Sequence, residues 1–174
     1  VCSSDLFGMR MELHQPYENL TYYGRGPFEN YIDRYSGAFI GRYEDKVENQ
    51  FYWYIRPQET GNKTDVRWLT LLDSGGLGVK ITGLQPISFS ALHFSPEDLD
   101  PGLTRKLQHT IDIVPQKNIF LHVDLKQRGL GGDNSWGMYP HNEYRLLDKK
   151  YTYSYMIELV EKGSDKNDYL NSRK

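Results

Sequence analysis

The sequence predicts an all-β fold, an antiparallel β-sandwich, and three observations support that prediction. Apolar and polar residues alternate along several short segments, as they do from Phe7 to Leu13, which is the period of a half-buried strand. Gly, Pro, Asn and Asp cluster between those segments, where turns are expected. Aromatic residues make up 14% of the chain, which suits sheets, and no long helical pattern is visible. Many short strands with little helix are typical of a sandwich.

The alternating segments predict the strands in chain order: residues 7–13, 66–72, 77–81, 107–113, 119–125 and 151–159. Residues 73–76, DSGG, are predicted to join two of them as a hairpin, and residues 114–118 are predicted to join two more. A helical turn is expected after Ser95, where Ser95 is the cap and Pro96 the first helical residue. A second helical turn is expected near residues 29–35.

Length and composition narrow the class of protein. The 174 residues fit one domain. With 21 basic and 23 acidic residues and no basic run, the chain is not expected to bind nucleic acid. No apolar run approaches the roughly 20 residues that cross a bilayer, so we expect no membrane segment. A soluble protein of the bacterial cytoplasm or periplasm is expected, and the compartment stays open. The single cysteine, Cys2, excludes an internal disulfide.

The chain is expected to divide into three parts. Residues 1–6, VCSSDL, look like a translated sequencing adapter, so we expect an artificial start there. Residues 7–162 carry the predicted sandwich. Residues 163–174 are polar and rich in lysine, which predicts a frayed tail.

A glycine-rich turn with a tryptophan, residues 128–137 (RGLGGDNSWG), is the leading candidate for a binding site. Glycines allow a tight turn, and Asp133 and Asn134 bond readily to nearby main chain, so the turn is expected to present Trp136 rigidly. A flat indole can cover the apolar face of a galactose ring, which is worth on the order of 1 kcal/mol. The alternative is that Trp136 fills the core of the sandwich.

Two dense polar loops, residues 22–34 and 54–68, leave function and structure open. In the first loop, Glu29 and Asp33 form a candidate carboxylate pair, or Arg25 and Asn30 bond sugar hydroxyls. On a structural interpretation, arginines pair with carboxylates within the loop, or the two loops interlock through bidentate Arg–carboxylate pairs.

Other site chemistry has little support. The five histidines are scattered and lack cysteine partners, which argues against zinc, and Asp133 and Asn134 do not have the spacing of a calcium loop. No phosphate-binding loop or nucleophile elbow is present. We keep His93 as a low-ranked candidate for substrate binding, with a structural role as the alternative.

Four motifs in this order, GRGPFENYIDR, YIRPQETGNKTDVRWL, FSALHFSPEDLD and GLGGDNSWG, resemble the C-terminal small-chain β-sandwich of family 2 β-galactosidases. The similarity runs over residues 7–160. The resemblance implies an antiparallel super-sandwich related to the galactose mutarotase fold, without the N-terminal strands of the family domain. It also implies that Trp136 stacks on the substrate sugar. It assigns no catalytic role to Arg25, Glu29, Asn30, Arg56 or Glu59.

The resemblance implies a parent enzyme that removes terminal β-D-galactose from β-galactosides such as lactose. Such retaining enzymes use two glutamates on a barrel of about 250 residues, which this chain is too short to hold, so the fragment is expected to be inactive alone. Its implied partners are that barrel, the N-terminal domains and the galactoside. Magnesium and sodium are implied for the parent, with no ligands or cofactor assigned here, and a homo-oligomeric parent stays open.

Two other functions remain as alternatives. A free-standing carbohydrate-binding module would bind galactosides without a barrel. An aldose epimerase on the related fold would need a histidine acid and a carboxylate base in one pocket, and His93 with Glu29 or Glu59 is the candidate set. The preferred aglycone stays open, as does a sister activity on glucuronides or mannosides.

Overall fold

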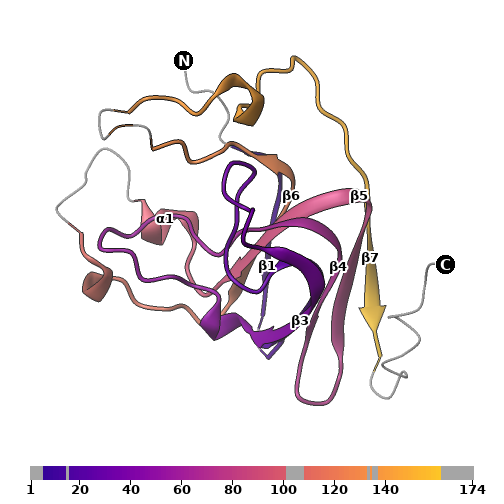
Figure 1. The fold of residues 1–174 in the computed structure, drawn as a ribbon. Coiled ribbons are helices and arrows are strands. Elements are labelled where there is room, and N and C mark those ends of the chain that lie inside the picture. The colour runs from indigo at the N-terminus through magenta and orange to yellow at the C-terminus, as the bar shows by residue number, and fades with distance from the viewer. Residues whose placement is uncertain (1–5, 15, 101–107, 133, 135–136, 162–174) are drawn as a thin grey trace.

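Seven antiparallel strands form one curved sheet in the computed structural model, which describes residues 6–14, 16–100, 108–132, 134 and 137–161 (Figure 1). The strands are β1 (Leu6–Leu13), β2 (Asn19–Gly26), β3 (Phe39–Lys46), β4 (Lys63–Leu72), β5 (Gly78–Leu92), β6 (Ile119–Gln127) and β7 (Tyr155–Val160). Their order in the sheet is β1-β6-β5-β4-β2-β3, and β7 also pairs with β5. The predicted all-β antiparallel class is confirmed, and the arrangement is consistent with a sandwich.

The longest strand, β5, organises the sheet because it has partners along its whole length. Its first half, Gly78 to Gly83, pairs with β7, and its second half, Ser88 to Leu92, pairs with β6. On its other side it pairs with β4. A break at residues 84–86, Leu-Gln-Pro, lies between the two halves. The sequence predicted only residues 77–81 of this strand, because alternation weakens at that break.

One face of the sheet carries the apolar core. Leu121 of β6 faces Met11 on β1 and Ala91 on β5, and Leu69 of β4 faces Tyr22 on β2 and Ile81 on β5. Directly paired residues point to the same face, so these rows form a continuous apolar layer. The fully buried members of the core are Leu20, Tyr22, Val47, Val66, Leu69, Leu71, Ile81, Ile87, Phe89, Ala91, Ile119, Leu121 and Val123.

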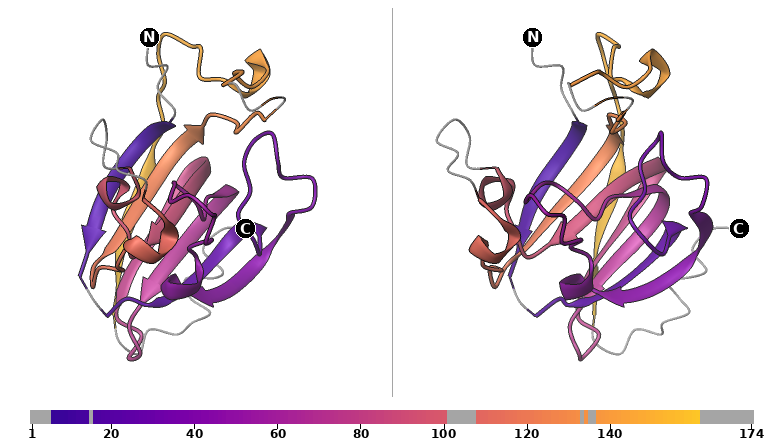
Figure 2. Two further views of the ribbon diagram at one scale, coloured as in Figure 1. Left: turned by 90° about the vertical axis from the view of Figure 1, so that its left-hand side faces the viewer. Right: turned by 60° about the vertical axis from the view of Figure 1, so that its left-hand side comes forward.

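Short helical turns cover the other face and the ends of the sheet. They are the 3-10 turns η1 (Val47–Asn49), η3 (Thr110–Asp112) and η4 (Asn142–Tyr144), and the single-turn helix α1 (Pro96–Leu99). Figure 2 shows α1 and η3 lying against the sheet. The predicted cap is confirmed, because the Ser95 side chain accepts a hydrogen bond from the Asp98 backbone N–H and Pro96 begins the helix.

The predicted strand over residues 107–113 is wrong, since residues 110–112 form η3. The Asp112 carboxylate accepts a hydrogen bond from the His109 backbone N–H at 2.8 Å, and such local bonds compete with strand pairing. Residues 114–118 therefore lead from η3 into β6 rather than joining two strands. The hairpin at residues 73–76 is confirmed, and it connects β4 to β5.

The helical turn expected near residues 29–35 is also wrong. Tyr31 and Arg34 form an isolated β-bridge with hydrogen bonds of 2.7 and 3.2 Å between their backbones, which closes a tight turn. The Asn30 backbone N–H donates to the Asn62 carbonyl, so it is not free for a helix. Strands β2 and β3 were missed because glycines interrupt them. A Cβ on Gly24 would lie 2.6 Å from the Val66 side chain, so the close approach of β2 to β4 requires glycine there.

Candidate functional site

The glycine-rich turn follows directly from the end of β6, as predicted. Three of its residues, Asp133, Ser135 and Trp136, lie outside the described residues. The candidates Asp133 and Trp136 therefore remain predictions. Asn134, the remaining candidate in the turn, is exposed. The backbone on both sides of this segment is described, and it shows how the turn is held.

Two adjacent residues from the loop after β2 hold the first half of the turn. The Asp33 carboxylate accepts a hydrogen bond from the Gly131 backbone N–H at 2.8 Å. The Arg34 guanidinium donates to the Gly131 carbonyl oxygen at 2.7 Å. Gly131 has a φ of +70°, in the left-handed region that favours glycine. The backbone N–H and the carbonyl oxygen of Gly131 are thus both bonded to the loop after β2, and Arg34 of that loop lies 97 residues earlier in the sequence.

A third hydrogen bond fixes the start of the turn, from the Gly129 backbone N–H to the Tyr144 carbonyl at 2.8 Å. A Cβ on Gly129 would lie 2.6 Å from the Asp33 carboxyl group, so only glycine lets this loop approach so closely. Figure 1 shows the loop after β2 and the segment after β6 at the same end of the sheet. Three hydrogen bonds to other segments therefore hold the described start of the turn, at Gly129 and Gly131.

Apolar side chains are exposed beside this turn. Leu130, Met138 and Tyr139 are each about half exposed. The guanidinium of Arg145 lies 4.7 Å from the centre of the Tyr139 ring, and that of Arg128 lies 5.8 Å from it. These cation–π contacts orient an aromatic face at the edge of the turn. The surface here has both apolar and hydrogen-bonding groups, as a sugar site requires.

One of the structural interpretations paired Arg25 or Arg34 with Glu29 or Asp33 within the first polar loop, but Asp33 and Arg34 have other partners in the described structure. Their partners are peptide groups of the glycine turn. One chemical signal could have indicated this role of Asp33 and Arg34. A tight glycine turn leaves backbone N–H and carbonyl groups without partners, and a neighbouring acid and base can form hydrogen bonds with both groups. Nothing in the local sequence says which acid and base are near.

The two polar loops do meet, as the structural interpretation predicted. Arg25 and Asp65 form an ion pair with the Arg25 Nε atom 2.5 Å from the Asp65 carboxylate. This carboxylate accepts from one nitrogen, so the predicted bidentate pairing is wrong. Asn30 is fully buried between the loops, and its side-chain oxygen accepts from the Thr64 backbone N–H at 3.0 Å. Its side-chain amide donates to the carbonyls of Arg25 and Phe28.

Glu29 of the first polar loop is also bonded to the second polar loop. Its carboxylate accepts hydrogen bonds from the Gly61 backbone N–H at 2.8 Å and from the hydroxyls of Tyr54 and Thr60. Burial and the hydrogen bond to Glu29 raise the pKa of Tyr54 to about 12, so Tyr54 stays a donor at neutral pH. Glu29 and Asp33 are bonded to different loops, and the structure does not make them a carboxylate pair.

His93 is held at the opposite end of β6 from the glycine turn. Its Nδ1 atom lies 3.1 Å from the carbonyl of Asn118, just before β6, and its Nε2 atom lies 3.1 Å from the Glu18 carboxylate. The nine residues of β6 separate Asn118 from Arg128, a distance of roughly 30 Å. His93 thus bridges Asn118 and Glu18, and it does not lie at the glycine turn.

The epimerase set is not brought together among the described residues. The carboxylate at His93 is Glu18, Glu29 is bonded to Gly61, and Glu59 accepts from the Gln127 amide at 2.8 Å.

Arg56, another motif residue, is exposed. In the described part of the chain, no three His, Cys, Asp or Glu side chains gather to hold a metal ion.

No helix within the described ranges has the length and hydropathy needed to span a bilayer.

The sequence of this chain is similar to those of known proteins. Residues 5–157 match the family model of the beta-galactosidase small chain. The chain is 38% identical over 152 residues to a beta-galactosidase of Priestia megaterium and 36% identical over 154 residues to one of Streptococcus thermophilus, in each case over 87% of this chain. It is 34% identical over 142 residues, 81% of this chain, to one of Halalkalibacterium halodurans. The aligned region spans only 14% of the length of each relative. This chain belongs to the beta-galactosidase small chain family.

Proposed function

We propose that this chain is the C-terminal part of a retaining β-galactosidase that hydrolyses terminal β-D-galactose residues in β-galactosides such as lactose. Three relatives that bear the name beta-galactosidase are about seven times longer than the aligned region, which leaves room for a catalytic barrel. The two catalytic glutamates belong to that barrel. This chain carries no catalytic carboxylate and contributes to the sugar pocket.

The clamp on Gly131 is the observation that best supports this role. A stacking residue contributes to binding only if it is held in place before the sugar arrives, because ordering it on binding costs free energy. Asp33 and Arg34 supply that order to the segment that leads into Trp136. Trp136 then lies against the apolar face of galactose, and the exposed side chains beside the turn contact the barrel.

The remaining architecture of the parent follows from the same proposal. Further strands supplied by the parent chain complete a super-sandwich of the galactose mutarotase type. Magnesium and sodium act in the parent, bound by residues of the other domains. The N-terminal domains and the barrel are the partners of this chain.

Replacement of Trp136 by Leu in the full-length enzyme tests the role of the indole. Loss of stacking worth about 1 kcal/mol should raise KM for a β-galactoside and the inhibition constant for galactose by about fivefold, with the fold intact. Steady-state kinetics and circular dichroism measure these quantities. Trp53→Leu is the matched control, because Trp53 is an exposed tryptophan on a different loop. Unchanged kinetics in Trp136→Leu would rule out the stacking role.

A further inference from the structure

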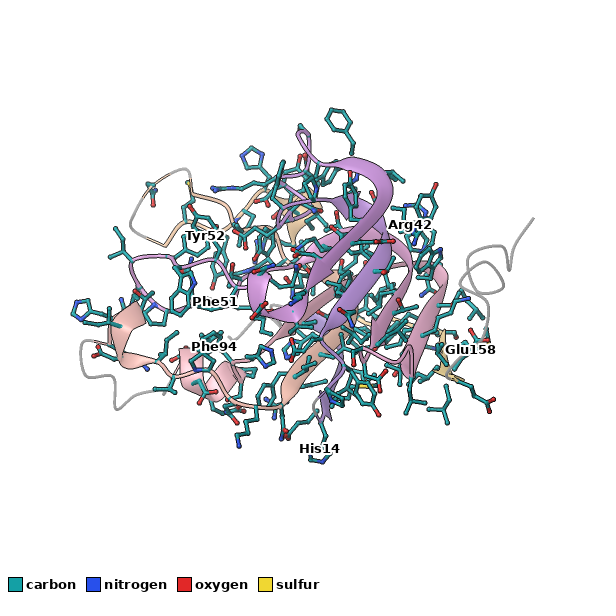
Figure 3. The ribbon with its side chains drawn as sticks, turned by 90° about the horizontal axis from the view of Figure 1, so that it is seen from below. His14, Arg42, Phe51, Tyr52, Phe94 and Glu158 are labelled. Atoms are coloured by element: carbon teal, nitrogen blue, oxygen red, sulfur yellow. The ribbon has the colours of Figure 1, made fainter. Side chains whose placement is uncertain are left out.

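A cavity of about 280 Å³ lies on the face of the sheet opposite the main apolar core, between α1 and the loop that leads from Tyr54 to β4. Residues 57–59 of that loop line it, together with Pro96 and Leu99 of α1. Phe94 also lines it, and the centre of its ring is 4.4 Å from that of Phe51, which is next to it in Figure 3. The volume is near the lower limit of small-molecule sites and fits a ligand of one ring.

Two cross-strand pairs of β5 and β6 form the floor of the cavity. Ser90 pairs with His122, and Leu92 pairs with Phe120. Directly opposite residues of antiparallel strands share a face, so the register alone places a hydroxyl and an imidazole next to two apolar side chains. The floor therefore combines hydrogen-bonding groups with an apolar surface.

The Ser90 hydroxyl and the His122 ring are the polar groups of this floor, and neither makes a hydrogen bond to another described residue. Ser90 is 2% exposed, and among the described residues its hydroxyl makes no hydrogen bond. The His122 ring also makes none there, and its Nδ1 atom is 3.9 Å from the Glu59 carboxylate. Neither the Ser90 hydroxyl nor the His122 ring is among the fully enclosed atoms without a partner, so both open into the cavity, where a ligand or water can bond them.

The charges of the lining set the class of ligand. Burial and the nearby Arg10 lower the pKa of His122, so the ring is neutral at pH 7 and can both donate and accept. Glu59 and Asp100 also line the cavity. Among the described residues that line it, none is Lys or Arg, so phosphates and uronic acids are disfavoured. A neutral ligand with several hydroxyls and an apolar face matches the lining.

We propose that this cavity is a second saccharide site, which binds one neutral pyranose ring between the Ser90–His122 pair and the apolar side chains of Leu92, Phe94 and Phe120. Its floor lies away from the glycine turn, because His122 and Arg128 are six residues apart along the end of β6, roughly 20 Å. The cavity comes nearest to the turn at Glu59, which lines it and accepts a hydrogen bond from Gln127, the residue before the turn. The proposal does not depend on Trp136 or on galactosidase activity. Half-saturation is expected at about 1 mM, from the efficiency usual for small ligands.

Saturation-transfer NMR with methyl β-D-galactoside tests the site in the 174-residue chain carrying Trp136→Leu, which removes the other proposed sugar contact. We expect a saturable signal, and Ser90→Ala or His122→Leu should weaken binding about fivefold each through loss of a hydrogen bond. Ser88→Ala is the matched control, since Ser88 is an equally buried serine on the same strand and does not line the cavity. An absent signal, or an equal loss in Ser88→Ala, would overturn the proposal.

A second measurement uses the full-length polypeptide. Diethyl pyrocarbonate modifies neutral imidazoles, and mass spectrometry reads its reaction at His122 separately from all other sites. The galactoside should slow that reaction about fivefold at saturation and leave the exposed His109 unchanged. If ethanolamine protects His122 and the galactoside does not, the cavity is an ammonium site and the saccharide proposal is wrong. Equal rates with and without the galactoside would also refute it.

Discussion

Asp124 illustrates how one residue can couple the fold to pH. It lies on β6, is fully buried, and its Oδ1 atom has no hydrogen-bond partner in the described structure. The Gln127 amide donates to its Oδ2 atom at 3.2 Å, and the Glu59 carboxylate bonded to the same amide adds a like charge. Burial, the dominant cause, raises the pKa of Asp124 to about 7, and Glu59 adds to this effect. The folded protein therefore holds a proton that the unfolded chain releases near pH 4.

This pKa shift predicts that the folded state loses stability as pH rises. Between pH 4 and pH 7 the folded state binds more protons than the unfolded state, so the free energy of unfolding falls with pH in that window. From pH 5 to pH 8 the loss is about 2 to 3 kcal/mol. Urea unfolding at both pH values measures it, at a concentration below that at which the chain associates. Asp124→Asn should abolish this part of the pH dependence.

Asp148→Asn, which changes an exposed carboxylate, is the control and should leave the pH dependence as it is. An Asp124→Asn variant whose stability changes between pH 5 and pH 8 as much as that of the wild type would contradict the assignment of a protonated Asp124.

At the scale of elements, α1 is short, and its stability depends on its ends. Ser95 and Asp98 form a reciprocal capping box, in which the Ser95 backbone N–H donates to the Asp98 carboxylate at 2.8 Å. The Gln116 side chain donates to the same carboxylate at 2.6 Å, which ties the helix to the segment before β6. The cap thus fixes one wall of the cavity as well as the helix.

Ser95→Ala should lower the free energy of unfolding by about 1 kcal/mol, because the Asp98 backbone N–H loses its acceptor. Ser95→Thr keeps the hydroxyl and should restore most of that loss. Urea unfolding curves measure both changes. Ser74→Ala, in the exposed hairpin, is the control and should change stability by less than about 0.5 kcal/mol. Equal stability of Ser95→Ala and wild type would show that the cap contributes nothing.

At the scale of the whole molecule, the sheet has an exposed edge. Strand β3 pairs only with β2 among the described strands, so one side of it has unpaired backbone groups. Phe39, at its start, is 73% exposed, and Ile40 is 40% exposed. The second half of the strand, from Arg42 to Lys46, carries charged residues that oppose pairing with the edge of another sheet. An exposed apolar edge strand is a site of association.

We therefore predict that the chain made without the rest of its parent self-associates through this edge. Phe39→Lys should reduce association markedly, because a charge on an edge strand opposes pairing with another edge. Light scattering over a concentration series measures it. Ile55→Lys is the control, since Ile55 is 90% exposed in a loop away from a sheet edge. A monomeric wild-type chain, or an equal effect of Ile55→Lys, would contradict the prediction.

Local patterns in the sequence were enough to predict the all-β class, the DSGG hairpin and the Ser95 cap, because each depends on residues close together in the chain. The family was indicated by the order of four motifs that are spread along the chain. Local patterns failed at residues 107–113, where a side chain bonds to nearby backbone, and at β2 and β3, where glycines hide the alternation. The order of strands and the open edge of β3 required the whole sheet.

The contacts of the sites were decided by tertiary structure alone. The sequence indicated that the glycine turn is rigid, but the clamp by Asp33 and Arg34 joins residues almost a hundred positions apart. The pairing of Ser90 with His122 depends in the same way on the register of β5 and β6. Side-chain chemistry determines which groups can bond, whereas chain topology determines which of them come within 3 Å of each other.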